Sequence, residues 1–89
     1  MKKLLVCAAT ALVLGLSTLS ASAAVVCRLN PYGDNFLSLR AGPGSGFPEI
    51  TRLGPNTGLS VLRGRGAWLE VQTEDGQVGW VFSRYVCGR

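Results

Sequence analysis

The sequence predicts an all-β protein, a small β-barrel of five to six short strands that follows a cleaved signal peptide. No stretch after residue 23 repeats its apolar residues with the 3.6-residue period of a helix. All four prolines and eleven of the twelve glycines lie in that part of the chain, where they break helices and mark turns. The apolar residues alternate with polar ones instead, as in short strands. So short a sheet is stable only if it curls on itself and removes its edges.

Residues 1–23 have the order of a secretory signal peptide. Two lysines follow the initial methionine, the next sixteen residues carry no charge, and the segment ends in the small residues Ala21-Ser22-Ala23. An uncleaved membrane anchor is the alternative, but it needs about 20 apolar residues, and this stretch is shorter and contains serine and threonine. We therefore expect cleavage near Ala23, a domain at residues 24–89 without membrane insertion, and a periplasmic or secreted location.

Two cysteines remain after removal of the leader, Cys27 and Cys87, near the two ends of the domain. In an oxidising compartment this arrangement predicts one disulfide that ties the first strand to the last. A redox pair would favour Cys-x-x-Cys spacing, and a zinc site would need more ligands. A disulfide that closes so long a loop contributes roughly 4 kcal/mol, a large share of the stability of a small domain.

The first half of the domain contains three expected strands. Residues 25–29 form the first, which ends at the turn-forming pair Asn30-Pro31. In residues 37–40 two leucines alternate with polar side chains, and the glycine- and proline-rich segment 41–48 that follows is a loop. Extended chain resumes at residues 50–53.

The second half is expected to contain a strand at 59–62, a loop at 63–66, strands at 68–73 and 77–82, and a closing strand at 85–87. The two longest strands form a hairpin, because the Asp75-Gly76 pair between them supplies the positive φ angles that such turns need.

The register of this hairpin decides which way Trp80 points. A two-residue turn pairs Trp80 with Val71 and puts the ring on the side of Leu69. One extra residue in the turn moves Trp80 beside Glu70 and toward Trp68, which makes an outer aromatic pair. The residues themselves do not choose between the two registers.

Three segments resemble the bacterial SH3-like (SH3b) family. They are residues 37–48 (LSLRAGPGSGFP), which are similar to its opening strand and L-x-x-R-x-G-P loop, residues 66–71 (GAWLEV), similar to G-x-W-x-x-V, and residues 75–81 (DGQVGWV) with Tyr85-Val86, similar to G-x-x-G-W-V … Y-L. Ser38 departs from the family's usual asparagine, and flanking cysteines are not a general family feature. The resemblance implies an SH3-like barrel, and it favours the register with Val71 and Val81 inward and Tyr85 near the same groove.

The residue types argue against an enzyme. The chain contains no histidine, so a serine or cysteine nucleophile has no imidazole to activate it. Glu74 and Asp75 are adjacent at a hairpin tip, where the aspartate serves the turn. The acids are otherwise scattered, without a calcium-binding spacing. We therefore expect no catalytic residue, no metal site and no cofactor. The mild positive charge also lacks the dense basic stripe of a nucleic-acid-binding protein.

The aromatic residues are the remaining candidates for a binding site. Most aromatic side chains in so small a barrel pack in its core, but tryptophan and tyrosine are also the preferred anchors of binding surfaces. We predict a shallow groove lined by Trp68, Trp80 and Tyr85, with Phe47 at its rim. Arg40 ends a strand just before Gly-Pro. It either pairs with an acid or caps loop carbonyls, or it contacts a carboxylate or phosphate of a ligand.

Two functions fit these features. SH3b domains occur on cell-wall hydrolases, where some are thought to bind peptidoglycan peptides. Together with the predicted export and the aromatic residues, the resemblance leads to the hypothesis of a non-enzymatic exported binding module that recognises a cell-wall peptide or another extended peptide of the envelope. We expect this module to be a monomer. The alternative is a protein–protein adaptor or inhibitor that acts on an envelope protein or a secreted partner.

Overall fold

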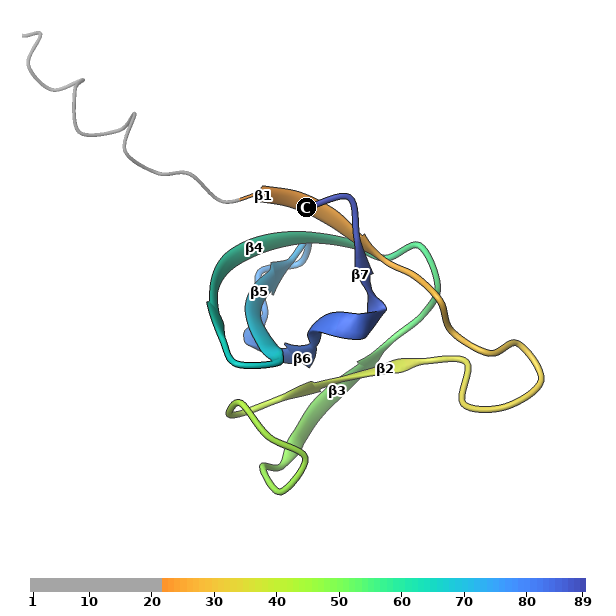
Figure 1. Ribbon diagram of the computed structural model, residues 1–89, viewed down its shortest axis with the longest axis horizontal. Coiled ribbons are helices and arrows are strands. Elements are labelled where there is room, and N and C mark those ends of the chain that lie inside the picture. The colour runs from red at the N-terminus through yellow and green to blue at the C-terminus, as the bar shows by residue number, and fades with distance from the viewer. Residues whose placement is uncertain (1–21) are drawn as a thin grey trace, which may run out of the picture.

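Seven strands form one antiparallel sheet in the computed structural model, which describes residues 22–89 (Figure 1). The strands are β1 (Ser22–Val26), β2 (Leu37–Arg40), β3 (Glu49–Leu53), β4 (Gly58–Arg65), β5 (Trp68–Thr73), β6 (Val78–Phe82) and β7 (Val86–Cys87), with one turn of 3₁₀ helix, η2 (Ser83–Tyr85), before the last. Their order in the sheet is β3-β2-β6-β5-β4-β1-β7. The ribbon curls around an interior, with the β2–β3 hairpin at one end, so the expected all-β architecture is confirmed, with seven strands in place of the five to six expected.

Most of the predicted signal peptide, residues 1–21, lies outside the described residues. The cleavage expected near Ala23 falls inside β1, and the two buried residues of that strand, Ala24 and Val26, lie beyond the cut. Within residues 22–89, no helix has the length and apolar character needed to cross a membrane.

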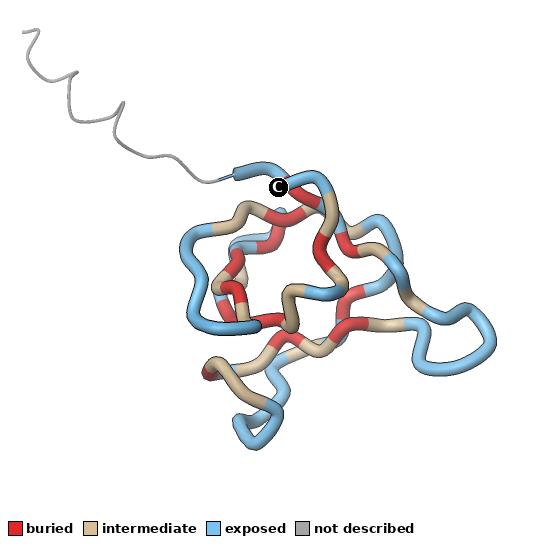
Figure 2. The backbone as a smooth tube through the Cα atoms, viewed as in Figure 1, coloured by how far each residue is buried: buried red, intermediate tan, exposed pale blue. Residues whose placement is uncertain are grey.

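Buried residues alternate with less buried ones along most of the strands, as the colouring of the backbone in Figure 2 shows, and the buried residues form the core. In β5, for example, Leu69, Val71 and Thr73 point inward, while the residues between them are half-buried or exposed. The buried cluster consists of Ala24, Val26, Leu37, Leu39, Leu53, Leu59, Leu69, Val71, Val81 and Val86. The two-residue period used to predict the strands is therefore the period of the core.

Two predicted elements are wrong by more than one residue, whereas the bounds of the others agree within one residue. The first strand was expected at 25–29, but β1 ends at Val26, because Arg28 has a φ of 58° and leaves the extended conformation. The segment 63–66 was expected to be a loop, but β4 continues to Arg65 because its residues pair with β5. The connecting turn contains only Gly66 and Ala67, and the φ of 60° at Gly66 allows so tight a turn.

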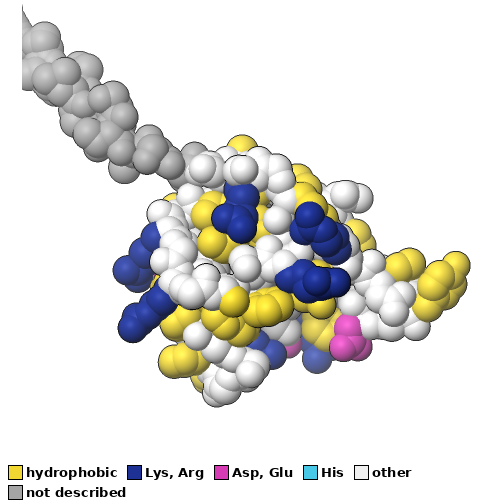
Figure 3. Space-filling view, viewed as in Figure 1, with side chains coloured by type: hydrophobic (Ala, Val, Ile, Leu, Met, Phe, Trp, Pro, Cys, Tyr) yellow, Lys and Arg dark blue, Asp and Glu magenta, His cyan; other side chains and the backbone are white. Residues whose placement is uncertain are grey.

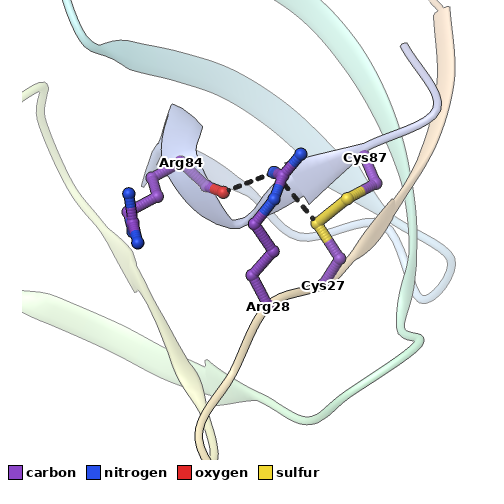
Figure 4. Close-up of a disulfide and its surroundings, with 4 residues drawn as sticks. All are labelled: Cys27, Arg28, Arg84 and Cys87. Atoms are coloured by element: carbon purple, nitrogen blue, oxygen red, sulfur yellow. Dashed lines mark hydrogen bonds between the residues drawn. A yellow bond between two sulfur atoms is a disulfide. The ribbon is translucent and has the colours of Figure 1, made fainter.

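The predicted disulfide between Cys27 and Cys87 is confirmed, with a Cα–Cα distance of 5.9 Å (Figure 4). β7 is only two residues long and pairs with β1, which in turn pairs with β4. The backbone N–H of Cys27 also donates to the carbonyl of Tyr85 at 3.0 Å. The disulfide therefore holds the last strand where few backbone hydrogen bonds do.

Replacement of both cysteines by serine should lower the free energy of unfolding by about 4 kcal/mol. The bond closes a loop between residues 60 apart in sequence, and the cross-link acts mainly by restricting the unfolded chain. Urea unfolding of the double variant and of the oxidised protein, followed by circular dichroism, measures the difference. Equal midpoints and slopes for the two proteins would contradict this expectation.

Gly79 marks the place where β2 lies closest to β6. A Cβ atom built on Gly79 would lie 2.7 Å from the backbone oxygen of Arg40 and 2.8 Å from Cγ of Leu39. Arg40 is also the residue through which β2 pairs with β6. A side chain at position 79 would therefore push the two strands apart at their joining point.

Gly79→Ala should destabilise the domain by roughly 1–3 kcal/mol, the usual cost of overpacking a core. Gly54→Ala is the matched control, since a Cβ atom there meets nothing within 4 Å, and we expect a change within about 0.5 kcal/mol. Thermal unfolding of the two variants compares them directly. Equal stability of the two variants would show that the close approach is not needed.

Candidate functional site

The three-residue turn Glu74-Asp75-Gly76, closed by a hydrogen bond from the N–H of Thr73 to the carbonyl of Gln77, connects β5 to β6 and sets their register. Gly76 has a φ of 91°, and its N–H donates to the carbonyl of Thr73 at 3.0 Å. The Thr73 hydroxyl donates to a carboxylate oxygen of Asp75 and accepts from the N–H of Gln77. Residue pairs on the two strands consequently follow the register with the extra turn residue, which puts Trp80 opposite Glu70. The register that the family resemblance favours is confirmed, with Val71 and Val81 fully buried.

Aromatic side chains line up on the outer face of this hairpin and continue into η2. Trp68 lies directly opposite Phe82, and their ring centroids are 5.5 Å apart in an edge-to-face arrangement. The Phe82 ring in turn lies 6.2 Å from that of Tyr85. The aromatic partner of Trp68 is therefore Phe82 rather than the Trp80 suggested by the sequence, because the direct cross-strand neighbour is closer than the diagonal one.

This aromatic row forms one wall of an open cavity of about 410 Å³. The cavity is lined by residues 28–30, Asp34, residues 36–38, Arg40, Ser45, Trp68, Phe82 and Tyr85. Its walls thus come from the segment after β1, from β2, from the loop after β2, and from the β5–β6–η2 region. Figure 3 shows basic side chains grouped around hydrophobic surface on the face in view.

Two arginines reach this cavity, and each is anchored by a backbone carbonyl. Arg40 donates from Nη1 to the carbonyl of Phe47 at 3.0 Å, which is the loop-capping contact that the sequence offered as one alternative. Arg28 donates from Nη1 to the carbonyl of Arg84 at 2.8 Å, and the same nitrogen lies 3.5 Å from Sγ of Cys27 (Figure 4). The disulfide and η2 therefore position Arg28.

Trp80 lies outside the cavity and is only 7% exposed. The Arg63 guanidinium covers its ring at 5.3 Å from the centroid. Arg63 also donates from Nε to Oε1 of Glu70 at 2.7 Å, and Glu70 is the cross-strand partner of Trp80. An ion pair thus covers Trp80 on the outer face of the sheet.

The row that contains Trp80 continues across the sheet to Arg40 and then to Glu49 on β3. Glu49 accepts from the Ser38 hydroxyl at 2.7 Å and from Nε of Arg52 at 2.9 Å. These two hydrogen bonds, the one from Ser38 foremost, lower the pKa of the Glu49 carboxyl and keep it ionised. The strand that carries Ser38 and Arg40 to the cavity is therefore held from its far side by β3.

Phe47 does not line the cavity either. Its side chain is 46% exposed, and its ring lies where a side chain on Gly42 would be. Of the five predicted ligand-binding residues, the structure brings Arg40, Trp68 and Tyr85 together at the cavity and leaves Trp80 and Phe47 outside it.

The cavity also contains residues that the sequence did not indicate as site residues, among them Arg28, Asp34, Phe36 and Phe82. Phe82 could have been found from the sequence, because in the register with the extra turn residue it faces the same side of the hairpin as Trp68. Arg28 could not, because its position depends on a positive φ at a non-glycine residue. Among the described residues, no three potential metal ligands group together.

The sequence of residues 35–86, more than half of the chain, matches the bacterial SH3 domain. The chain belongs to the bacterial SH3 domain family. Its all-β sheet is consistent with the SH3-like fold that the family name implies, and such domains typically serve as binding modules. None of the curated proteins compared with the sequence matches it. The family therefore supports a binding role, and the choice of ligand has to come from the cavity.

Truncation of the two tryptophans should separate stability from binding in this SH3 domain. Trp80→Ala removes a buried ring and should lower the free energy of unfolding by about 3 kcal/mol or more. Trp68 is only half-buried at the cavity wall, so Trp68→Ala should cost less than half as much. Urea unfolding followed by circular dichroism checks both. A larger loss for Trp68→Ala than for Trp80→Ala would contradict this assignment.

Proposed function

We propose that this bacterial SH3 domain is an exported, non-enzymatic module that holds an extended peptide of the cell envelope, with peptidoglycan peptides as the ligand class. The observation that carries the proposal is the wall of three aromatic rings, Trp68, Phe82 and Tyr85, along an open cavity. Rigid aromatic side chains offer large contact areas at low entropic cost, which is why they anchor many peptide and protein interfaces.

The compartment supports the same proposal. The Cys27–Cys87 disulfide is typical of a protein that folds in an oxidising, extracytoplasmic environment. Export by the predicted signal peptide would bring the domain into contact with the cell wall. A cavity of about 410 Å³ is also of the size that accommodates a few residues of a peptide rather than a folded surface.

Sedimentation with purified sacculi tests the proposal. The processed protein should co-sediment at low salt, and Trp68→Ala and Tyr85→Ala should each reduce the bound fraction roughly fivefold, as expected for anchor residues. Val78→Ala is the control, since Val78 is exposed on β6 outside the cavity and its truncation should leave binding unchanged. Protein that stays in the supernatant at low salt would refute wall binding.

One observation favours the alternative, an adaptor or inhibitor of an envelope protein. Tyr32 is 97% exposed, in the segment that joins β1 to β2. The N–H groups of Tyr32 and Gly33 both donate to Asn30, to its side chain and to its carbonyl respectively, so this turn presents the tyrosine in a fixed place. Exposed tyrosines are common at protein interfaces.

Photo-crosslinking from position 32 in intact cells distinguishes the two functions. An adaptor should give one crosslinked protein band from position 32 and should not bind sacculi. A peptide-binding module should bind sacculi and give no discrete band from that position. Val78 again serves as the control position for the crosslinker.

A further inference from the structure

Neither arginine of the cavity forms an ion pair within 4.0 Å with a carboxylate of the described residues. Within residues 22–89, the ion pairs closer than 4.0 Å are Arg52–Glu49 and Arg63–Glu70. Asp34 lines the same cavity as Arg28 and Arg40, yet it makes an ion pair with neither. Two positively charged side chains and one negatively charged side chain therefore line the same cavity without forming an ion pair across it.

Both guanidinium groups are nevertheless held in place. Each has a single hydrogen-bonded nitrogen on a backbone carbonyl, at 2.8 Å for Arg28 and 3.0 Å for Arg40. A guanidinium has five N–H donors in a planar fork, so donors remain on each side chain. The fork matches the two oxygens of a carboxylate, and an arginine that is already positioned loses little entropy on binding one.

The charges in the cavity favour a peptide over a polyanion. A phosphate polymer presents a continuous row of negative charge, which Asp34 would repel. A peptide places amide or amine donors a few ångströms from each carboxylate, and a carboxylate such as Asp34 accepts hydrogen bonds from such donors. The aromatic wall of Trp68, Phe82 and Tyr85 adds apolar surface for side chains of a peptide.

We propose that the cavity recognises a peptide segment with a free carboxylate next to an amine or amide donor. Arg28 and Arg40 bind the carboxylate, Asp34 accepts from the donor, and the aromatic wall packs against the residue between them. This assignment rests on the proposed function, because it names the chemical class of the peptide that the same cavity holds.

The probe is a mixture of soluble muropeptides, released from sacculi by a muramidase and used either native or with their carboxyl groups amidated. The whole chain is expressed so that cells export and process it, and the processed protein is purified with its disulfide intact. Titration followed by tryptophan fluorescence gives the dissociation constants. Amidation should weaken binding roughly tenfold or more, a factor that corresponds to about 1.4 kcal/mol.

Variants of the two arginines test whether the effect of amidation on binding arises at the cavity. Arg28→Gln and Arg40→Gln should each weaken binding of native muropeptides roughly tenfold and change binding of amidated ones little. Arg89→Gln removes the same charge at the C-terminus, outside the cavity, and should bind as the unaltered protein does. If either variant fails to fold, the comparison of native with amidated muropeptides still decides the question. Inorganic polyphosphate serves as the polyanion competitor and should not displace native muropeptides.

The outcomes separate the two proposals. Equal binding of native and amidated muropeptides overturns the carboxylate assignment and leaves the proposed function standing. Displacement by polyphosphate at the same charge concentration also overturns it, in favour of a polyanion. Binding to neither muropeptides nor sacculi overturns both proposals. Loss of binding on amidation, together with the effects of the arginine variants, supports both.

Discussion

The three-residue turn between β5 and β6 decides which side of the sheet each of their side chains occupies. With Glu70 opposite Trp80, Val71 and Val81 enter the core, and the aromatic residues of both strands point outward. A turn shorter by one residue would exchange the two faces of β6 relative to β5. Gly76 and the hydrogen bonds of Thr73 hold this turn. The aromatic wall of the cavity therefore depends on backbone geometry at the opposite end of the hairpin.

Segments near both ends of the described chain also contribute to the sheet and to the cavity. Residues 35–86 match the bacterial SH3 domain, so β1 and both cysteines lie outside the matched segment. β1 nevertheless stands between β4 and β7 in the sheet and contributes to the core. Arg28, just after the disulfide, brings a charge to the cavity. The flanking segments of this chain thus complete the sheet and also supply one wall of the candidate site.

Much of the fold could be predicted from the sequence. Strand alternation and turn residues are local signals, and the two cysteines of the domain can pair with each other in only one way. The central strands, the hairpin and the disulfide were found in this way. β1 was misplaced because four of the five residues at 25–29 are apolar, which favours a strand, and nothing in the segment indicates the positive φ at Arg28. The end of β4 was missed because an arginine–glycine segment resembles a loop, whereas pairing with Trp68 and Glu70 keeps it extended.

The site was less predictable because exposure depends on contacts that are distant in sequence. Trp80 is on the expected outer face, but Arg63 covers it, and no local pattern reveals that pairing. Trp68 and Tyr85 belong to segments that resemble the family motifs, and both line the cavity. Arg28 and Asp34 come from a segment without regular structure, where side-chain direction follows individual φ and ψ angles rather than a period.

The same strand, β2, serves both the core and the cavity. Leu37 and Leu39 are buried, whereas Ser38 and Arg40 face outward; Leu37, Ser38 and Arg40 all border the cavity. Each outward residue is fixed by a hydrogen bond, Ser38 to Glu49 and Arg40 to the carbonyl of Phe47. A site whose polar groups and rings are already held in place loses little conformational freedom on binding. Because the outward side chains of β2 alternate with the buried leucines, Ser38 and Arg40 can be changed to alter the ligand while the leucines keep the sheet together.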